Sequence, residues 1–146
     1  LRILIAEESP FSRGLLRSSL EMGGYAVAEA VDAQDALAKL SGQRFDMVLV
    51  AVDLPDDGAA RMSELVRRQP ELAGIPLIAV QPVQYSDAPA RTVPEGYAAM
   101  LSRYDREAML RSIDRLAKAL ESADSIGARG RLPMEDGLPC GKGDSR

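Results

Sequence analysis

The chain has 146 residues and a formal net charge of −4, with 46% hydrophobic and 27% charged residues. This length suits one ordinary domain with a tail. The acidic balance argues against a nucleic-acid partner, because nucleic acid is bound by basic surfaces. No apolar run approaches the roughly 20 residues of a membrane span, so we expect a cytoplasmic protein without direct membrane contact.

The lack of histidine and the scarcity of cysteine restrict the possible chemistry further. The chain has no histidine and a single cysteine, Cys140. Ser-His-Asp catalysis, Cys-His catalysis and His-ligated zinc are therefore excluded, and no disulfide framework is expected. Any metal would have to be a hard cation held by carboxylates. The chain opens on a strand-like segment without an initiator Met, so we expect a piece of a longer protein.

The first predicted element is a buried strand over residues 2–6. Ser9 and Pro10 then have the residue types of an N-cap and a first helical position. The following helix is predicted to stop at the Gly23–Gly24 pair. Its expected inward face consists of Phe11, Leu15, Leu16 and Leu20.

A weaker strand is predicted over residues 25–30, before a short helix capped by Asp32 and closed by Gly42. The inward residues of that helix are Ala36, Leu37 and Leu40. The third strand is the run VLVAV at residues 48–52. A third helix starts at Asp57 or Gly58, with Met62, Leu65 and Val66 as its apolar residues.

The fourth strand is predicted over residues 75–80. Residues 81–95 follow with three prolines and no helical stripe, so we expect an irregular or shortened fourth helix there. A short strand over residues 97–101 precedes a last helix capped by Asp105. The apolar stripe of this helix is Leu110, Ile113, Leu116, Ala117 and Leu120.

Residues 122–146 are rich in glycine and proline, which is typical of a flexible linker. We therefore expect a domain over residues 1–121. Strand and helix alternate five times along it, with crossovers long enough for parallel pairing. The pattern predicts an α/β fold with one doubly wound, five-stranded parallel sheet and helices on both faces. Ligand chemistry would then lie at the carboxyl ends of the strands.

Four ordered motifs give the chain a family resemblance. The runs are ILIAEESPF, VLVAVDLPDDG, GIPLIAVQP and LSRYDREAMLRSI. Together they resemble the response-regulator receiver family over roughly residues 1–121. The resemblance implies the flavodoxin-like (βα)5 fold and phosphoryl transfer from a phosphohistidine to an aspartate. In that family an acidic pair holds Mg²⁺, a Ser or Thr binds the phosphoryl group, and a Lys neutralises it.

Carried over to this sequence, the family's site is depleted. Glu7 and Glu8 keep the acidic pair, but Ala51 occupies the phosphoacceptor position and has no nucleophilic atom. Gln81 replaces the hydroxyl residue and Arg103 replaces the Lys. The loop after the third strand is also one residue shorter than the family pattern. The resemblance therefore implies a pseudo-receiver that is not an enzyme and cannot be phosphorylated at Ala51.

Such a domain would regulate neighbouring domains by docking, inside a hybrid histidine kinase of a two-component system or phosphorelay. Two alternatives stay open: an atypical receiver phosphorylated at Asp53 or Asp57, and a ligand-free adaptor that dimerises through its last helix. No metal is expected. The candidates for a residual Mg²⁺ site are Glu7, Glu8 and Asp53.

Some degenerate receivers bind cyclic di-GMP, and the resemblance suggests this ligand here. Guanidinium groups suit its phosphates, and flat side chains stack on guanine. Three of the chain's four tyrosines fall in the segment from Gln81 to Tyr104. The candidate ligand residues are Tyr85, Pro89, Arg91, Tyr97, Arg103 and Tyr104. The alternative is that Tyr97 packs in the core.

Overall fold

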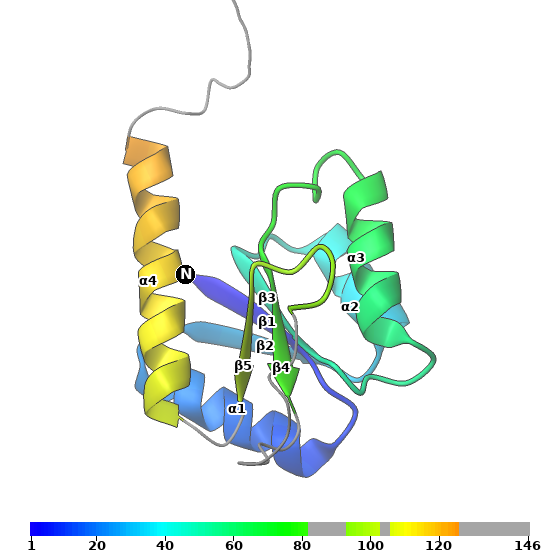
Figure 1. The fold of residues 1–146 in the computed structure, drawn as a ribbon, viewed down its shortest axis with the longest axis horizontal. Coiled ribbons are helices and arrows are strands. Elements are labelled where there is room, and N and C mark those ends of the chain that lie inside the picture. The colour runs from blue at the N-terminus through cyan, green and yellow to red at the C-terminus, as the bar shows by residue number, and fades with distance from the viewer. Residues whose placement is uncertain (82–92, 103–105, 126–146) are drawn as a thin grey trace, which may run out of the picture. The chain divides into compact units, whose positions relative to one another are not determined.

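The computed structural model describes residues 1–81, 93–102 and 106–125, apart from the side chains of 123–125. Five strands form one parallel sheet in the order β2-β1-β3-β4-β5 (Figure 1). The elements in chain order are β1 (Arg2–Ala6), α1 (Pro10–Met22), β2 (Ala26–Ala30), α2 (Ala33–Gly42), β3 (Met47–Ala51), α3 (Gly58–Arg68), β4 (Leu77–Gln81), β5 (Ala99–Ser102) and α4 (Arg106–Ser125). The predicted fold class, a five-stranded parallel sheet with helices on both faces, is confirmed. Most of the segment 81–95, where an irregular or shortened fourth helix is predicted, lies outside the described residues.

The chain divides into two compact units, Leu1–Leu110 and Arg111–Arg146, and the boundary falls inside α4. The first unit contains the whole sheet with α1, α2 and α3. In the second, buried Ile113 and Ala117 repeat the predicted four-residue spacing of the last helix. This helix runs to Ser125, past residue 121, the predicted end of the domain.

Two helix starts lie where their capping residues predict them. Ser9 Oγ accepts a hydrogen bond from the Ser12 N–H at 3.3 Å, and Pro10 is the first residue of α1. Asp32 Oδ1 accepts from the Asp35 N–H at 2.8 Å and caps α2. These local contacts satisfy N–H groups that have no partner inside the helix.

The predicted inward face of α1 is wrong at Phe11, which is 70% exposed. The buried residues of α1 are instead Ser12, Leu16, Ser19 and Leu20. These positions repeat at the four- and three-residue spacing of one helix face. Phe11 precedes the first of them by one residue, which rotates its side chain about 100° away from that face.

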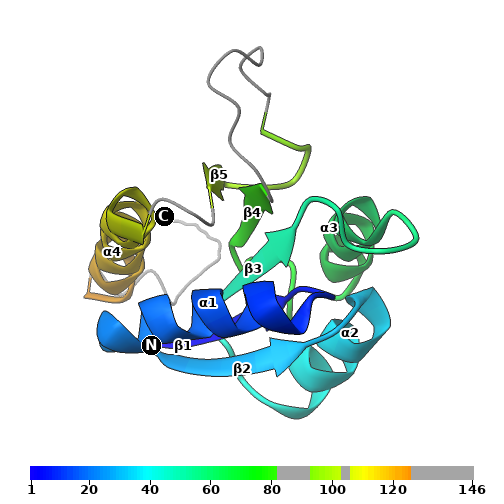
Figure 2. The ribbon, with the colours of Figure 1, turned by 90° about the horizontal axis from the view of Figure 1, so that it is seen from below.

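The three central strands of the sheet, β1, β3 and β4, are largely buried, whereas the edge strands β2 and β5 are partly exposed. All five residues of β3 are buried, as expected for the central strand of a parallel sheet. On one face, Leu4, Val48 and Val50 pack in a single cluster with side chains of α2 and α3. Helix α1 lies on the other face (Figure 2), where Leu16 and Leu20 are fully buried. The two layers hold the carboxyl ends of the strands in fixed positions.

Candidate functional site

The carboxyl ends of β1, β3, β4 and β5 meet at one edge of the sheet, as the sequence predicts. Ala6 of β1 pairs with Val50 of β3, so the positions of Glu7 and Ala51 follow one step later on neighbouring strands. Along the same edge, Gln81 of β4 pairs with Ser102 of β5. From β1 the chain adds β2 on one side of the sheet and then β3 on the other, so the topological switch point lies between β1 and β3. Open α/β sheets bind ligands at such a point.

The two acids of the pair lie in different environments. Glu7 is 3% exposed, whereas Glu8 is exposed to solvent. One carboxylate oxygen of Glu7, Oε2, accepts a hydrogen bond from the Ser9 N–H at 3.0 Å. The Glu7 N–H in turn donates to the Ala30 carbonyl at 3.0 Å, extending the β1–β2 ladder. Glu7 therefore has a structural role at the turn into α1.

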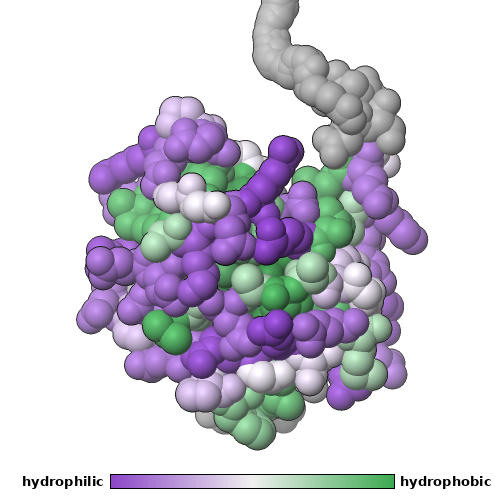
Figure 3. Space-filling view, turned by 180° about the vertical axis from the view of Figure 1, so that it is seen from behind, coloured by the Kyte–Doolittle hydropathy of each residue, from purple (hydrophilic) through white to green (hydrophobic). Residues whose placement is uncertain are grey.

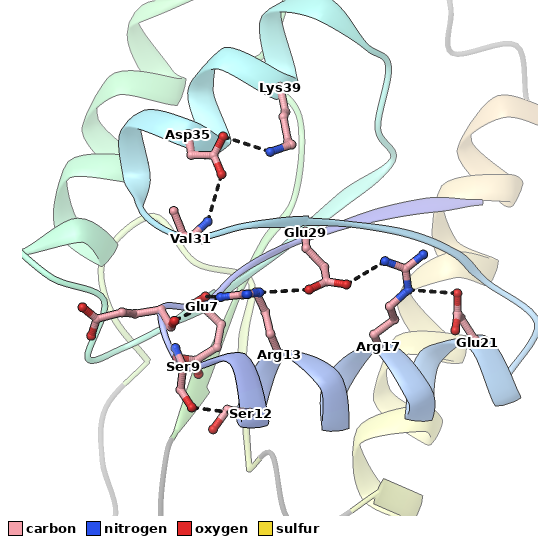
Figure 4. A network of polar contacts seen from close by, with 11 residues as sticks. Glu7, Ser9, Ser12, Arg13, Arg17, Glu21, Glu29, Val31, Asp35 and Lys39 are labelled. Carbon is pink, nitrogen blue, oxygen red and sulfur yellow. Dashed lines mark hydrogen bonds and ion pairs between the residues drawn. The ribbon is translucent and has the colours of Figure 1, made fainter.

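Arg13 ties this corner to the edge strand β2 (Figure 4). Its Nη1 donates to the backbone carbonyls of Glu7 and Glu8, both at 3.0 Å. Its Nε forms an ion pair with Glu29 Oε1 at 2.9 Å, and Arg17 Nη1 holds the other oxygen of Glu29. Sequence reasoning missed Arg13, although its position one turn into α1 and the acid on the adjacent strand were both visible.

The Glu29 network predicts a pH-dependent stability. Hydrogen bonds from Arg17, then from Arg13, lower the pKa of Glu29 below its ordinary value. A lowered folded-state pKa gives stability that is full above the unfolded pKa and is lost as pH falls through the folded pKa. Glu29→Gln should therefore cost roughly 1 kcal/mol at neutral pH, since these pairs are partly exposed.

Urea unfolding of the wild type and Glu29→Gln measures this difference as a function of pH. The gap should shrink as pH falls below about 4.5, the ordinary range of a Glu carboxyl. Glu21→Gln is the matched control, because Glu21 contacts only the exposed Arg17 in this network. A gap that stays constant down to pH 3 would show that the carboxylate charge is not what stabilises the corner.

Ala51 closes β3 with a methyl group and is 1% exposed. Two residues on, Asp53 is exposed in the loop. Among the described residues, no group of three or more Asp, Glu, His or Cys side chains is placed to hold a metal ion. Glu7, Glu8 and Asp53 therefore do not form a three-carboxylate site.

The loop between β3 and α3 is compressed. Asp56 and Asp57 both adopt left-handed backbone conformations, with φ of 59° and 55°. Asp57 makes no side-chain capping bond to α3. A Cβ on the next residue, Gly58, would lie 2.6 Å from a methyl carbon of Leu54, so only glycine fits there. This geometry needs residue types that tolerate positive φ.

Most of the predicted ligand residues lie outside the described residues, namely Tyr85, Pro89, Arg91, Arg103 and Tyr104. Tyr97 is described and takes the alternative position in the core, at 8% exposure. Its hydroxyl donates to the Ala59 carbonyl at 2.6 Å, and burial raises the pKa of that hydroxyl. Beside it, Ser63 Oγ donates to the Glu95 carbonyl at 3.1 Å. These bonds fasten the segment before β5 onto α3.

The surface gives no broad apolar face in the view of Figure 3, where apolar residues form several separate patches among hydrophilic ones. Exposed large apolar side chains include Phe11 and Met22, at opposite ends of α1. Among the described helices, none is long and apolar enough to cross a membrane.

Comparison with known proteins identifies the fold and its relatives. The family model of the response regulator receiver domain matches residues 3–114. The gliding motility regulatory protein of Myxococcus xanthus is 26% identical over 118 residues, which are 80% of this chain and 15% of that protein. The sensor histidine kinase RcsC of Escherichia coli is 29% identical over 103 residues, 70% of this chain and 11% of that protein.

Among solved structures, the chemotaxis response regulator CheY4 of Vibrio cholerae superposes with a TM-score of 0.66 at 24% identity. The superposition covers 78% of this chain and 96% of that one. At this identity the likeness bears on the fold alone. The chain spans only a small part of the two curated relatives, 15% and 11% of their lengths.

Proposed function

The chain belongs to the response regulator receiver domain family, and from this membership we propose that it is a receiver that accepts no phosphoryl group. It would act instead by docking on neighbouring domains of a larger cytoplasmic signalling protein, a hybrid histidine kinase. This is a pseudo-receiver function, in which the fold is kept for its surfaces.

The observation that carries the proposal is the methyl group of Ala51 at the carboxyl end of the central strand. Phosphoryl transfer needs an oxygen nucleophile there, and a methyl group supplies none. The neighbouring carboxylate of Glu7 is buried and accepts a backbone N–H, so it is not presented as a substitute. Gln81 at the end of β4 offers an amide in place of the family's hydroxyl.

Beryllofluoride with Mg²⁺ tests this proposal, because it mimics a phosphoryl group on a receiver aspartate. We expect no bound fluorine resonance in ¹⁹F NMR and no amide shifts at residues 7–8 and 51–53. A receiver that keeps its aspartate is the positive control. A bound resonance accompanied by shifts at this corner would contradict the proposal.

Docking within a parent protein is supported by the relatives, in which the matched region is a small part of a long sensor or regulatory chain. We propose residues 1–121 as the docking domain and 122–146 as a linker to the next domain. A tethered domain meets its partner at a high effective concentration, so weak contacts suffice for regulation.

Cyclic di-GMP is the proposed input in place of phosphorylation. Tyr97 is not available for stacking, because its ring is buried and its hydroxyl is bonded to Ala59. The ligand would therefore depend on Arg91, Arg103, Tyr85 and Tyr104. Isothermal titration with cyclic di-GMP should give saturable heat, with GMP as the control ligand. Arg91→Ala should lower the affinity for cyclic di-GMP by about tenfold. No heat and no shift in melting temperature would remove the ligand from the proposal.

A further inference from the structure

An open groove of about 720 Å³ runs along α3, between this helix and residues 94–97. Helix α2 packs on one flank of α3 (Figure 1). The groove lies along another flank, because no residue of α2 lines it. The α3 side of the groove includes Ala59, Ala60 and Ser63, with Asp57 at its start and Arg67 at its end. All of these residues belong to the first compact unit.

The middle of this α3 face carries three small side chains together with Glu64, which is paired with Arg68. Ala59, Ala60 and Ser63 are spaced so that they share one side of the helix. Ser63 is 6% exposed, and its hydroxyl is already bonded to the Glu95 carbonyl. Small residues leave room for a second helix at the usual interaxial distance of about 8–10 Å.

The two ends of the face carry opposite charges. Within the described part of the chain, neither the Asp57 carboxylate nor the Arg67 guanidinium makes a hydrogen bond or ion pair, whereas Arg68 is paired with Glu64 at 3.0 Å. Ten helical steps separate Asp57 from Arg67, about 15 Å, which is too far for them to pair with each other. Arg67 lies against Gly96 on the groove side, where a Cβ on that glycine would lie 2.6 Å from its Nη2.

We propose that this face binds the same face of a second copy of the chain, with the two α3 helices antiparallel. A two-fold interface must be self-complementary. An antiparallel pair brings the acidic start of each α3 to the basic end of the other, so Asp57 of each copy meets Arg67 of the other, and the contact occurs twice in the dimer. The half-buried Ala59 and the exposed Ala60 leave room for the partner helix near the crossing point. This contact needs neither phosphoryl group nor ligand, and it uses α3 rather than the last helix.

Sedimentation equilibrium of the full chain from micromolar to millimolar concentration tests the contact. We expect a reversible dimer that weakens as salt is raised. Arg67→Glu should weaken dimerisation by about tenfold or more, because two-fold symmetry replaces two attractive contacts with two repulsive ones. Arg61→Glu is the matched control, since it makes the same charge change on α3 at an exposed position outside the groove lining.

A charge swap gives the sharpest readout. Asp57→Lys should also weaken self-association, but an equimolar mixture of Arg67→Glu and Asp57→Lys should form a heterodimer with affinity near that of the wild type. Circular dichroism checks that both variants fold. A wild-type chain that stays monomeric up to millimolar concentration would overturn the proposal. Arg67→Glu and Arg61→Glu weakening dimerisation equally would overturn it as well. If Asp57→Lys does not fold, the comparison of those two arginine variants still decides the outcome.

Discussion

Replacing Gly96 by alanine should destabilise the protein by roughly 3 kcal/mol and lower its melting temperature by roughly 10 °C. Gly96 has a φ of +89°, in the region that favours glycine. Its added Cβ would collide with Ser63 Oγ and crowd the Arg67 guanidinium. Ser63 could not move without breaking its bond to the Glu95 carbonyl. Backbone strain and steric overlap would therefore act at one residue.

Gly14→Ala is the matched control for this prediction. Gly14 lies in the middle of α1, and a Cβ there meets no atom within 4 Å. Alanine should raise stability by up to about 1 kcal/mol, because it is the better helix former. Thermal and urea unfolding measure both variants. If Gly96→Ala proved as stable as the wild type, the close packing of this segment on α3 would be wrong.

Ala51→Asp should cost about 2–4 kcal/mol at neutral pH. The new carboxyl would replace a side chain that is 1% exposed, one strand away from the buried Glu7. Burial and a neighbouring carboxylate both raise the pKa of such a group. A raised folded-state pKa gives stability that is present below the unfolded pKa and is lost as pH rises through the folded pKa. The penalty should therefore grow between about pH 4 and pH 7.

Ala51→Asn separates charge from shape, because the amide has nearly the same size and does not ionise. Its cost should be smaller and independent of pH over the same range. Urea unfolding of the three proteins at several pH values makes the comparison. A cost of Ala51→Asp that is flat with pH would show that the carboxyl reaches solvent, and that the corner is more open than the burial of Glu7 and Ala51 indicates.

Local signals in the sequence were sufficient to predict the helix starts and the parallel sheet. Ser9–Pro10 and Asp32 marked helix starts because their caps are contacts with residues only three positions away. The parallel sheet followed from short apolar runs alternating with helices. Phe11 was misplaced because two adjacent stripes of α1 differ by only one residue, and tertiary packing selected the other stripe.

The candidate site depends on contacts between residues far apart in the sequence, which a linear pattern does not contain. Arg13 reaches Glu29 across sixteen positions, and Tyr97 reaches Ala59 across thirty-eight. The family resemblance predicts that Ala51 stands at the phosphoacceptor position. It gave no indication that Glu7 accepts a hydrogen bond from the Ser9 N–H, or that Asp56 and Asp57 adopt positive φ.

The intact mass of the full chain after incubation with a small-molecule phosphodonor and Mg²⁺ shows whether the chain accepts a phosphoryl group. A receiver that keeps its aspartate, treated in parallel, should gain the mass of one phosphoryl group. We predict that this chain keeps its original mass, because Ala51 presents only a methyl group at the end of β3. A gain of one phosphoryl group, mapped to Asp53 or Asp57, would contradict the account.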